Sequence, residues 1–300
     1  MALHLATFRT RTITAAIFVA VMLAGLFLSR WTFFFLFSVI HFGCWIEYQK
    51  LIKRIDPDYA DISPIHKYGV MIAGWCFMLY FTDNSFQIFG ISLHSLGWWI
   101  GMVLAFVLPI SELLISGNLK LKTIGYSALG LLYISLTWGL LVDIYCMEIR
   151  HREVLSTPGF NENFFSGTRI LLPSVMIATI WINDTMAYLV GSLIGKTPFS
   201  KISPKKTWEG TAGGALLAIV IVSFSMIYIE PKSPIWFWLV FTSIAAISGT
   251  FGDLLESKLK RMADVKDSGK IMPGHGGFLD RFDSLLLAIS FIWIYLSLIF

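Results

Sequence analysis

The chain has 300 residues, of which 56% are apolar and only 14% are charged, and its net charge is +4. A soluble domain carries about 25% charged residues, so this composition excludes an ordinary soluble domain and indicates a polytopic membrane protein, with a small positive charge that reflects topology and not nucleic acid binding. The three cysteines, Cys44, Cys76 and Cys146, have no paired spacing and are expected to be small buried hydrophobes.

Apolar segments long enough to cross a bilayer recur along the chain. A spanning helix needs about 20 mostly apolar residues, and this length predicts an all-α membrane protein with about nine transmembrane helices. The third predicted span is short and its ends are poorly defined by the pattern. In chain order the predicted spans are Thr12–Ser29, Trp31–Ile52, Tyr68–Phe81, Ile91–Ser116, Ile124–Met147, Arg169–Leu193, Gly210–Ile229, Ser233–Leu255 and Ser284–Phe300.

The basic residues predict the orientation of these spans. If the N-terminus is cytoplasmic, 18 of the 23 lysines and arginines fall in cytoplasmic segments. Cytoplasmic loops of membrane proteins are enriched in Lys and Arg. The asymmetry therefore predicts a cytoplasmic N-terminus and, with nine spans, a C-terminus on the outside.

The first five spans, within residues 1–168, contain no motif that indicates chemistry. Glu47 and Glu112 lie near predicted cytoplasmic helix ends, where we expect carboxylates to be solvated. Residues 169–300 are expected to form a catalytic region of about four spans with two cytoplasmic active-site loops.

The sixth span contains a polar interruption at Asn183 and Asp184. An ionisable residue inside a membrane segment is costly and indicates function. Tyr188 is four residues beyond Asp184 and shares its helix face. A hydrogen bond between helices of the bundle is the alternative explanation.

A basic segment precedes the seventh span. Ser203 and Pro204 break the helix, and Lys205 and Lys206 stand just before the next helix begins. Lysines oppose the dipole at a helix N-terminus, which favours anions, so an anion shared between the lysines and the helix amides would explain them. A topological anchor is the alternative. The segment ends in glycines that permit close approach of a helix or a ligand: Gly210, Gly213 and Gly214.

The longest polar stretch, residues 251–283, combines three kinds of residue that suit a metal-assisted phosphate site. Carboxylates suit a hard divalent cation, basic side chains suit phosphates, and glycines let backbone amides approach an anion. Asp253 and Glu256 are three residues apart at one helix end, and Asp280 and Asp283 are three apart at the start of the next. A hairpin of these spans would bring both pairs around one cation, although acids at a helix start are also favourable without a metal.

The run S-x-L-K-R-x4-K-D-x-G-x3-P-x-H-G-G-F-x-D-R-F-D, from Ser257 to Asp283, resembles the signature of the phosphatidate cytidylyltransferase (CDP-diacylglycerol synthase) family. The S-P-K-K-T-W-E-G run and the Asn-Asp pair are similar to further motifs of that family. The resemblance implies transfer of CMP from CTP to phosphatidic acid, with CDP-diacylglycerol and pyrophosphate as products. It places the enzyme in the cytoplasmic (inner) membrane with its active site facing the cytoplasm.

The resemblance also implies roles for individual residues. Asp253, Asp280 and Lys260 are expected to be catalytic, and Asp253, Asp280 and Asp283 are expected to hold Mg²⁺. A second cation such as K⁺ and a homodimer are compatible with the sequence. The residues expected to bind the two substrates are Asn183, Asp184, Ser203, Lys205, Lys206, Arg261, Lys266, His275, Gly276, Gly277 and Arg281.

Three other functions are compatible with parts of the sequence. A cytidylyltransferase for an isoprenoid ether lipid phosphate would have the same motifs. An ion-coupled transporter would explain Asp184, but it predicts charges spread through several spans near the bilayer centre. A non-catalytic scaffold bound to anionic lipid would explain the basic loops and leave the paired carboxylates unexplained.

Overall fold

The computed structural model describes residues 5–115, 121–155, 172–271 and 276–299, and almost all of them are helical. The chain forms two compact units. The first unit comprises residues 1–142 and 259–282, and the second comprises residues 143–258 and 283–300. The sequence predicts a different division, at residue 168, between N-terminal helices and a catalytic region. That division stays a prediction.

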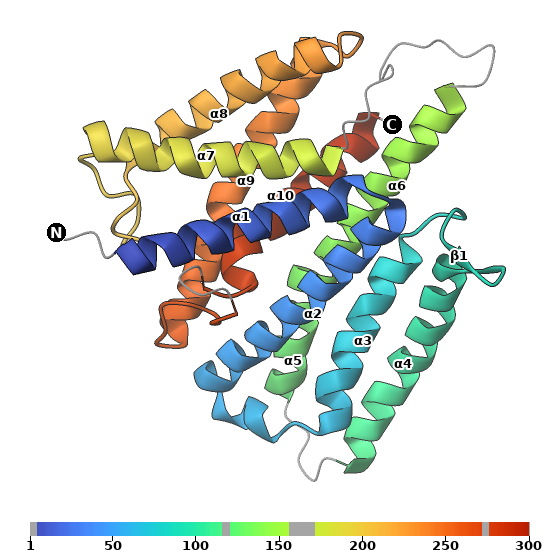
Figure 1. Ribbon diagram of the computed structural model, residues 1–300. Coiled ribbons are helices and arrows are strands. Elements are labelled where there is room, and N and C mark those ends of the chain that lie inside the picture. The colour runs from blue at the N-terminus through green and yellow to red at the C-terminus, as the bar shows by residue number, and fades with distance from the viewer. Residues whose placement is uncertain (1–4, 116–120, 156–171, 272–275, 300) are drawn as a thin grey trace. The chain divides into compact units, whose positions relative to one another are not determined.

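The first unit is built mainly from the N-terminal helices. Helices α2, α3 and α4 lie side by side in Figure 1, and α3 and α4 are connected by a short β-hairpin of strands β1 and β2. A π-helical segment, η2, interrupts the long helix made by α5 and α6, and most of α6, from Asp143 onward, belongs to the second unit. The elements are α1 (Leu5–Phe27), α2 (Arg30–Ile55), the 3₁₀ helix η1 (Pro57–Asp61), α3 (Pro64–Tyr80), β1 (Gln87–Ile88), β2 (Ile91–Ser92), α4 (Leu93–Ile115), α5 (Leu121–Gly130), η2 (Leu131–Leu136) and α6 (Thr137–Leu155).

The second unit contains α7, α8 and most of α9 and α10. Helices α7 and α8 form an antiparallel pair that runs side by side in Figure 1. The C-terminal end of α9, from Leu259, and the N-terminal end of α10, to Phe282, belong to the first unit. The elements are α7 (Leu172–Ile194), α8 (Trp208–Ile229), α9 (Ile235–Met262) and α10 (Leu279–Ile299).

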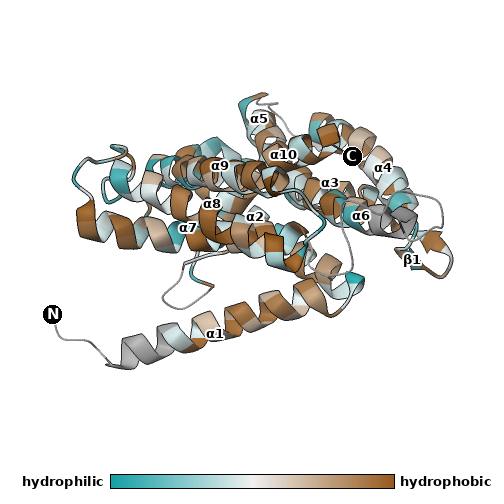
Figure 2. Ribbon diagram, turned by 90° about the horizontal axis from the view of Figure 1, so that it is seen from above, coloured by the Kyte–Doolittle hydropathy of each residue, from teal (hydrophilic) through white to brown (hydrophobic). Residues whose placement is uncertain are grey.

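Each of the nine predicted spans overlaps a helix within the described residues. Seven helices of the described residues are long and apolar enough to cross a bilayer, which confirms an all-helical polytopic membrane protein. Figure 2 shows hydrophobic residues along most helices and hydrophilic residues gathered at helix ends and connections. The other two predicted spans correspond to shorter apolar helices, Thr12–Phe27 of α1 and α3. The count of nine spans therefore stays a prediction, as do the sides of the membrane on which the termini lie.

Capping interactions explain where the predicted helix ends differ from the observed ones. Helix α3 begins four residues before the predicted Tyr68, because Ser63 accepts a hydrogen bond from the backbone N–H of His66 at 3.0 Å and Pro64 takes the first helical position. Helix α9 continues to Met262 and carries its polar C-terminal turns beyond the apolar span. The cysteines Cys44, Cys76 and Cys146 are free and buried, as expected.

Glycines set the close approach of α7 and α8. A Cβ atom at Gly214 would lie 2.5 Å from the backbone nitrogen of Ala187. Backbone atoms cannot move aside as a flexible side chain can. We therefore expect Gly214→Ala to destabilise the protein by about 1–3 kcal/mol, the usual cost of overpacking a tight contact.

Thermal unfolding in detergent, with Gly125→Ala as the control, tests this expectation. A Cβ at Gly125 of α5 meets no atom within 4 Å, so that variant should be neutral or slightly stabilising. Equal unfolding midpoints for Gly214→Ala and the wild type would show that α7 and α8 are not held this closely.

Candidate active site

Three carboxylates of the second unit form a candidate metal centre. Asp253 and Glu256 are one helical turn apart on α9, and Asp283 stands in the first turns of α10. One carboxylate oxygen from each lies within 4.8 Å of the others, and Glu256 and Asp283 are buried. Three like charges this close disfavour one another in a buried place, so a bound cation or protonation of one carboxylate would stabilise the cluster.

The backbone of α9 brings this cluster together. A Cβ at Gly252 would lie 2.5 Å from the carbonyl oxygen of Asp283, so glycine lets the two helices approach at the level of the carboxylates. All three donors are oxygens, which suit a hard divalent cation such as Mg²⁺. The donor set therefore fits the metal that the sequence predicts, with Glu256 as a member that the predicted set did not contain.

Lys206 supplies a positive charge to the same cluster. Its ammonium group forms an ion pair with Asp253 Oδ2, and Ser257 Oγ donates to Asp253 Oδ1 at 3.3 Å. Lys206 is held in place by a folded turn, because its backbone N–H donates to the Ser203 carbonyl at 3.1 Å and its own carbonyl accepts from Phe199 at 2.7 Å. Thr207 then caps α8. In this structure Lys206 neutralises a carboxylate, while Lys205 beside it is exposed.

The polar pair of the sixth predicted span is divided between two environments. Asn183 is 3% exposed, and its amide donates to Thr250 Oγ1 of α9 at 3.4 Å, one turn before Asp253. Its Oδ1 atom has no hydrogen-bond partner within the described residues. Asp184 is exposed, as is Tyr188. The structure therefore joins Asn183 to α9, and a ligand role for Asp184 stays a prediction.

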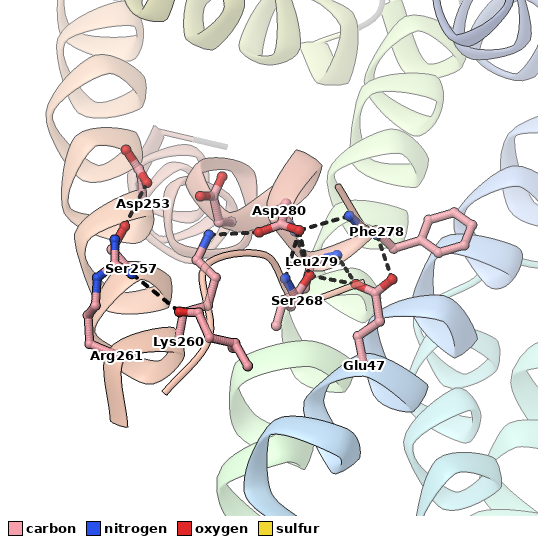
Figure 3. A network of polar contacts seen from close by, with 12 residues as sticks. Glu47, Asp253, Ser257, Lys260, Arg261, Ser268, Phe278, Leu279 and Asp280 are labelled. Carbon is pink, nitrogen blue, oxygen red and sulfur yellow. Dashed lines mark hydrogen bonds and ion pairs between the residues drawn. The ribbon is translucent and has the colours of Figure 1, made fainter. Parts of the chain in front are cut away.

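Asp280 belongs to a second polar network, in the first unit, drawn in Figure 3. Lys260 Nζ donates to its Oδ1 at 2.7 Å. Its Oδ2 accepts from the Ser268 N–H at 2.9 Å, the Ser268 hydroxyl at 2.9 Å and the Gly277 N–H at 2.8 Å. Four donors thus fix this carboxylate to both ends of the loop that connects α9 and α10.

Glu47 of α2 completes this network, although its carboxylate was expected to be solvated. Glu47 is buried, with 3% of the residue exposed. It accepts from the Phe278 N–H at 3.0 Å, the Leu279 N–H at 2.9 Å and the Ser268 hydroxyl at 2.7 Å (Figure 3). A carboxylate at these amides favours the N-terminus of α10, which explains why α10 begins before the predicted Ser284.

The network is packed tightly around the Glu47 carboxylate. A Cβ at Gly277 would lie 2.2 Å from Glu47 Oε2, and one at Gly269 would lie 2.1 Å from Oε1. Ser268 has one hydroxyl hydrogen and lies within hydrogen-bond distance of both Glu47 and Asp280. The serine therefore couples the two carboxylates, because the hydrogen cannot be donated fully to both.

The expectation that Glu47 and Glu112 are solvated is wrong. Glu112 is also buried and contacts His66 Nδ1 at 3.3 Å and the Ser63 hydroxyl at 3.2 Å. Both carboxylates lie within predicted apolar spans, and an ionisable residue there indicates a structural or functional partner. That signal was present at Glu47, between Ile46 and Tyr48.

The remaining predicted residues are placed as follows. Gly276 has a left-handed backbone with φ of 84°, and His275 lies outside the described residues. Arg261 donates to the Val265 carbonyl at 3.3 Å. Lys266 and Arg281 are exposed. Asp253 and Asp280 belong to different units, so their predicted meeting over one cation stays a prediction.

Comparison with known proteins adds independent information. The sequence matches the cytidylyltransferase family over residues 9–299. It is 34% identical over 225 residues to the phosphatidate cytidylyltransferase of Bacillus subtilis, which covers 75% of this chain and 76% of that protein.

Shorter matches have higher identity. The phosphatidate cytidylyltransferase of Staphylococcus saprophyticus is 44% identical over 111 residues, covering 37% of this chain and 43% of that protein. That of Staphylococcus epidermidis is 42% identical over 131 residues, covering 43% of this chain and 50% of that protein.

Proposed function

The chain belongs to the cytidylyltransferase family, and we infer from this premise that it is a phosphatidate cytidylyltransferase. A phosphate oxygen of phosphatidic acid attacks the α-phosphorus of CTP. The bond from that phosphorus to the oxygen bridging to the β-phosphate breaks, and pyrophosphate leaves. CDP-diacylglycerol is the lipid product.

The single observation that carries the chemistry is the cluster of Asp253, Glu256 and Asp283 beside Lys206. The attacking phosphate is already ionised at neutral pH, so a strong general base is unnecessary. The difficulty is repulsion between two anions, which positioned positive charge relieves. The family match disfavours a transporter and a scaffold, and a scaffold would also leave the three clustered carboxylates unexplained.

We propose that Asp253, Glu256 and Asp283 hold Mg²⁺. A bound Mg²⁺ would neutralise phosphate charge and orient the nucleotide. Lys206 would have a separate task, because its ammonium group is held beside Asp253 and could bind a phosphate oxygen of the substrate there. A second cation such as K⁺ stays a prediction.

The first unit is proposed to contribute fixed cations and backbone amides. Asp280 holds the ammonium group of Lys260 and the Gly277 amide, and Glu47 holds the next two amides along the chain. We assign Asp280 to this positioning role. The basic residues proposed to bind the phosphates of CTP and phosphatidic acid are Lys205, Lys206, Lys260, Arg261, Lys266 and Arg281.

We further propose that the protein resides in the cytoplasmic membrane with nine spans and its active site on the cytoplasmic side. The support is the concentration of lysine and arginine in alternate connecting segments. CTP is a cytoplasmic nucleotide, and the signature stretch lies in one of those basic segments.

Turnover by the purified protein tests the function. With CTP, phosphatidic acid and Mg²⁺ we expect equal amounts of CDP-diacylglycerol and pyrophosphate. Excess EDTA should abolish both, because three carboxylates without a cation repel the nucleotide, and excess Mg²⁺ should restore them. Product formation that is indifferent to EDTA would contradict the metal assignment, while preference for an isoprenoid ether lipid phosphate would contradict the substrate.

A further inference from the structure

The first unit contains a cationic cavity that the reaction does not use. Its volume is about 250 Å³, and it lies where α2 ends, η1 turns and α3 begins. Three lysines line it: Lys50 and Lys53 from the last turns of α2, and Lys67 from the first turn of α3. No carboxylate lines the cavity, and within the described residues none of these lysines forms an ion pair.

Most contacts that fix the walls of the cavity do not involve the lysine ammonium groups, although Lys67 Nζ lies 5.4 Å from the centroid of the Tyr68 ring. Gln49 is 5% exposed, and its amide donates to the backbone carbonyl of Lys67 at 3.0 Å, which ties α2 to α3. Asp56 caps η1 through the Asp58 N–H at 3.1 Å. Tyr59 is buried, with its hydroxyl 3.3 Å from Ser127 Oγ. The cavity is therefore preformed, and an occupant would not have to order it.

The charge of the cavity selects an anion. Lys50 and Lys53 are three residues apart on one helix, where like charges destabilise each other. Lys67 adds a third positive charge to the same space. All three lysines are exposed, as a topological anchor requires, but an anchor gives no reason for three of them to line one cavity.

The remaining lining selects an amphipathic ligand. Ile46, Ile62, Tyr68 and Met71 form its apolar part. Ile46 is 46% exposed and Tyr68 is 57% exposed, on helices that extend from this end into the apolar part of the protein. A soluble phosphate would leave this apolar surface uncovered, whereas an acyl chain would cover it.

We propose that this cavity binds the phosphate headgroup of an anionic bilayer phospholipid. Lys50, Lys53 and Lys67 are the phosphate ligands, and Ile46 and Tyr68 contact an acyl chain. Basic pockets between membrane helices are suited to such headgroups, with about 1 kcal/mol from each lysine near the bilayer surface. The proposal rests on the cavity alone and does not depend on the proposed reaction.

Native mass spectrometry of the full-length protein in mild detergent tests it. We titrate phosphatidylglycerol and phosphatidylcholine with identical acyl chains against the wild type and the triple variant Lys50→Gln, Lys53→Gln, Lys67→Gln. The wild type should bind phosphatidylglycerol more tightly than phosphatidylcholine. The triple variant should lose about 100-fold in affinity for phosphatidylglycerol, and Lys53→Gln alone about 5-fold.

A control variant separates a specific site from general electrostatics. Lys196→Gln, Lys201→Gln, Lys232→Gln removes the same charge from exposed positions of the second unit, and it should bind like the wild type. Equal losses in the two triple variants would overturn the proposal, as would equal binding of phosphatidylcholine or full displacement of the lipid by millimolar glycerol 3-phosphate. If the triple variant does not fold, the result for Lys53→Gln decides.

Discussion

An Asp283→Asn enzyme is expected to lose at least about 100-fold in turnover and to need much more Mg²⁺ for half-maximal rate. The substitution keeps the size of the side chain and removes one negative charge from the three-carboxylate cluster. Removing one preorganised electrostatic contact typically costs a factor of about 10² to 10³ in rate. Folding should survive, because the oxygen that accepts from the Ser284 N–H is also present in asparagine. Initial rates across a Mg²⁺ series measure both effects.

Asp264→Asn is the matched control for this experiment. Asp264 lies in the same polar stretch, is exposed, and has a left-handed backbone with φ of 52°, a conformation that asparagine also tolerates. It should keep wild-type turnover. Asp280→Asn distinguishes the two candidate metal sets, because it should lower turnover without raising the Mg²⁺ requirement if Asp280 positions Lys260. A raised Mg²⁺ requirement in Asp280→Asn as well as in Asp283→Asn would return the metal to the set predicted from the sequence, which contains both residues.

Helical periodicity explains why part of this site was predictable. Long apolar segments form helices in a bilayer, so the helical membrane-spanning architecture follows from hydropathy. Asp253 and Glu256 share a face of α9 because they are three residues apart. Asp283 was predicted because it lies close to the start of the next helix, α10. The prediction included Asp280 in the same set, since spacing along a helix start cannot tell which of two acids turns toward which neighbour.

The role of Glu47 depends on information that local sequence does not contain. Glu47 contacts Ser268 and Leu279, which are more than 200 residues away along the chain. A carboxylate near the end of an apolar helix is solvated in one fold and buried in another, and composition does not separate these outcomes. The sequence could have indicated a buried role for Glu47, because burying a charge is costly and requires hydrogen-bond donors elsewhere in the chain.

Glu47→Gln is expected to lower turnover by about 10- to 100-fold, the usual effect of removing a partner that orients a functional group. The Glu47 carboxylate accepts from two backbone amides and a hydroxyl. A glutamine side chain offers one oxygen in place of two, and its NH₂ group would face a donor. The loop that carries Gly277 should then lose its fixed position, so we expect kcat to fall more than KM for CTP rises. Amide hydrogen exchange at Phe278 and Leu279 should become faster.

Glu112→Gln separates this positioning effect from a general loss of stability. Among the described residues, Glu112 is the other buried glutamate of the first unit, and it contacts His66 and Ser63, which are not part of the signature stretch. Leaving a buried donor without its acceptor costs about 1–3 kcal/mol, so both variants should unfold at lower temperature. Only Glu47→Gln should lose turnover at a temperature where both are folded. Equal turnover losses at equal destabilisation would reduce Glu47 to a structural residue, whereas partial recovery in Glu47→Asp, which keeps the charge on a shorter side chain, would support its role in holding the loop.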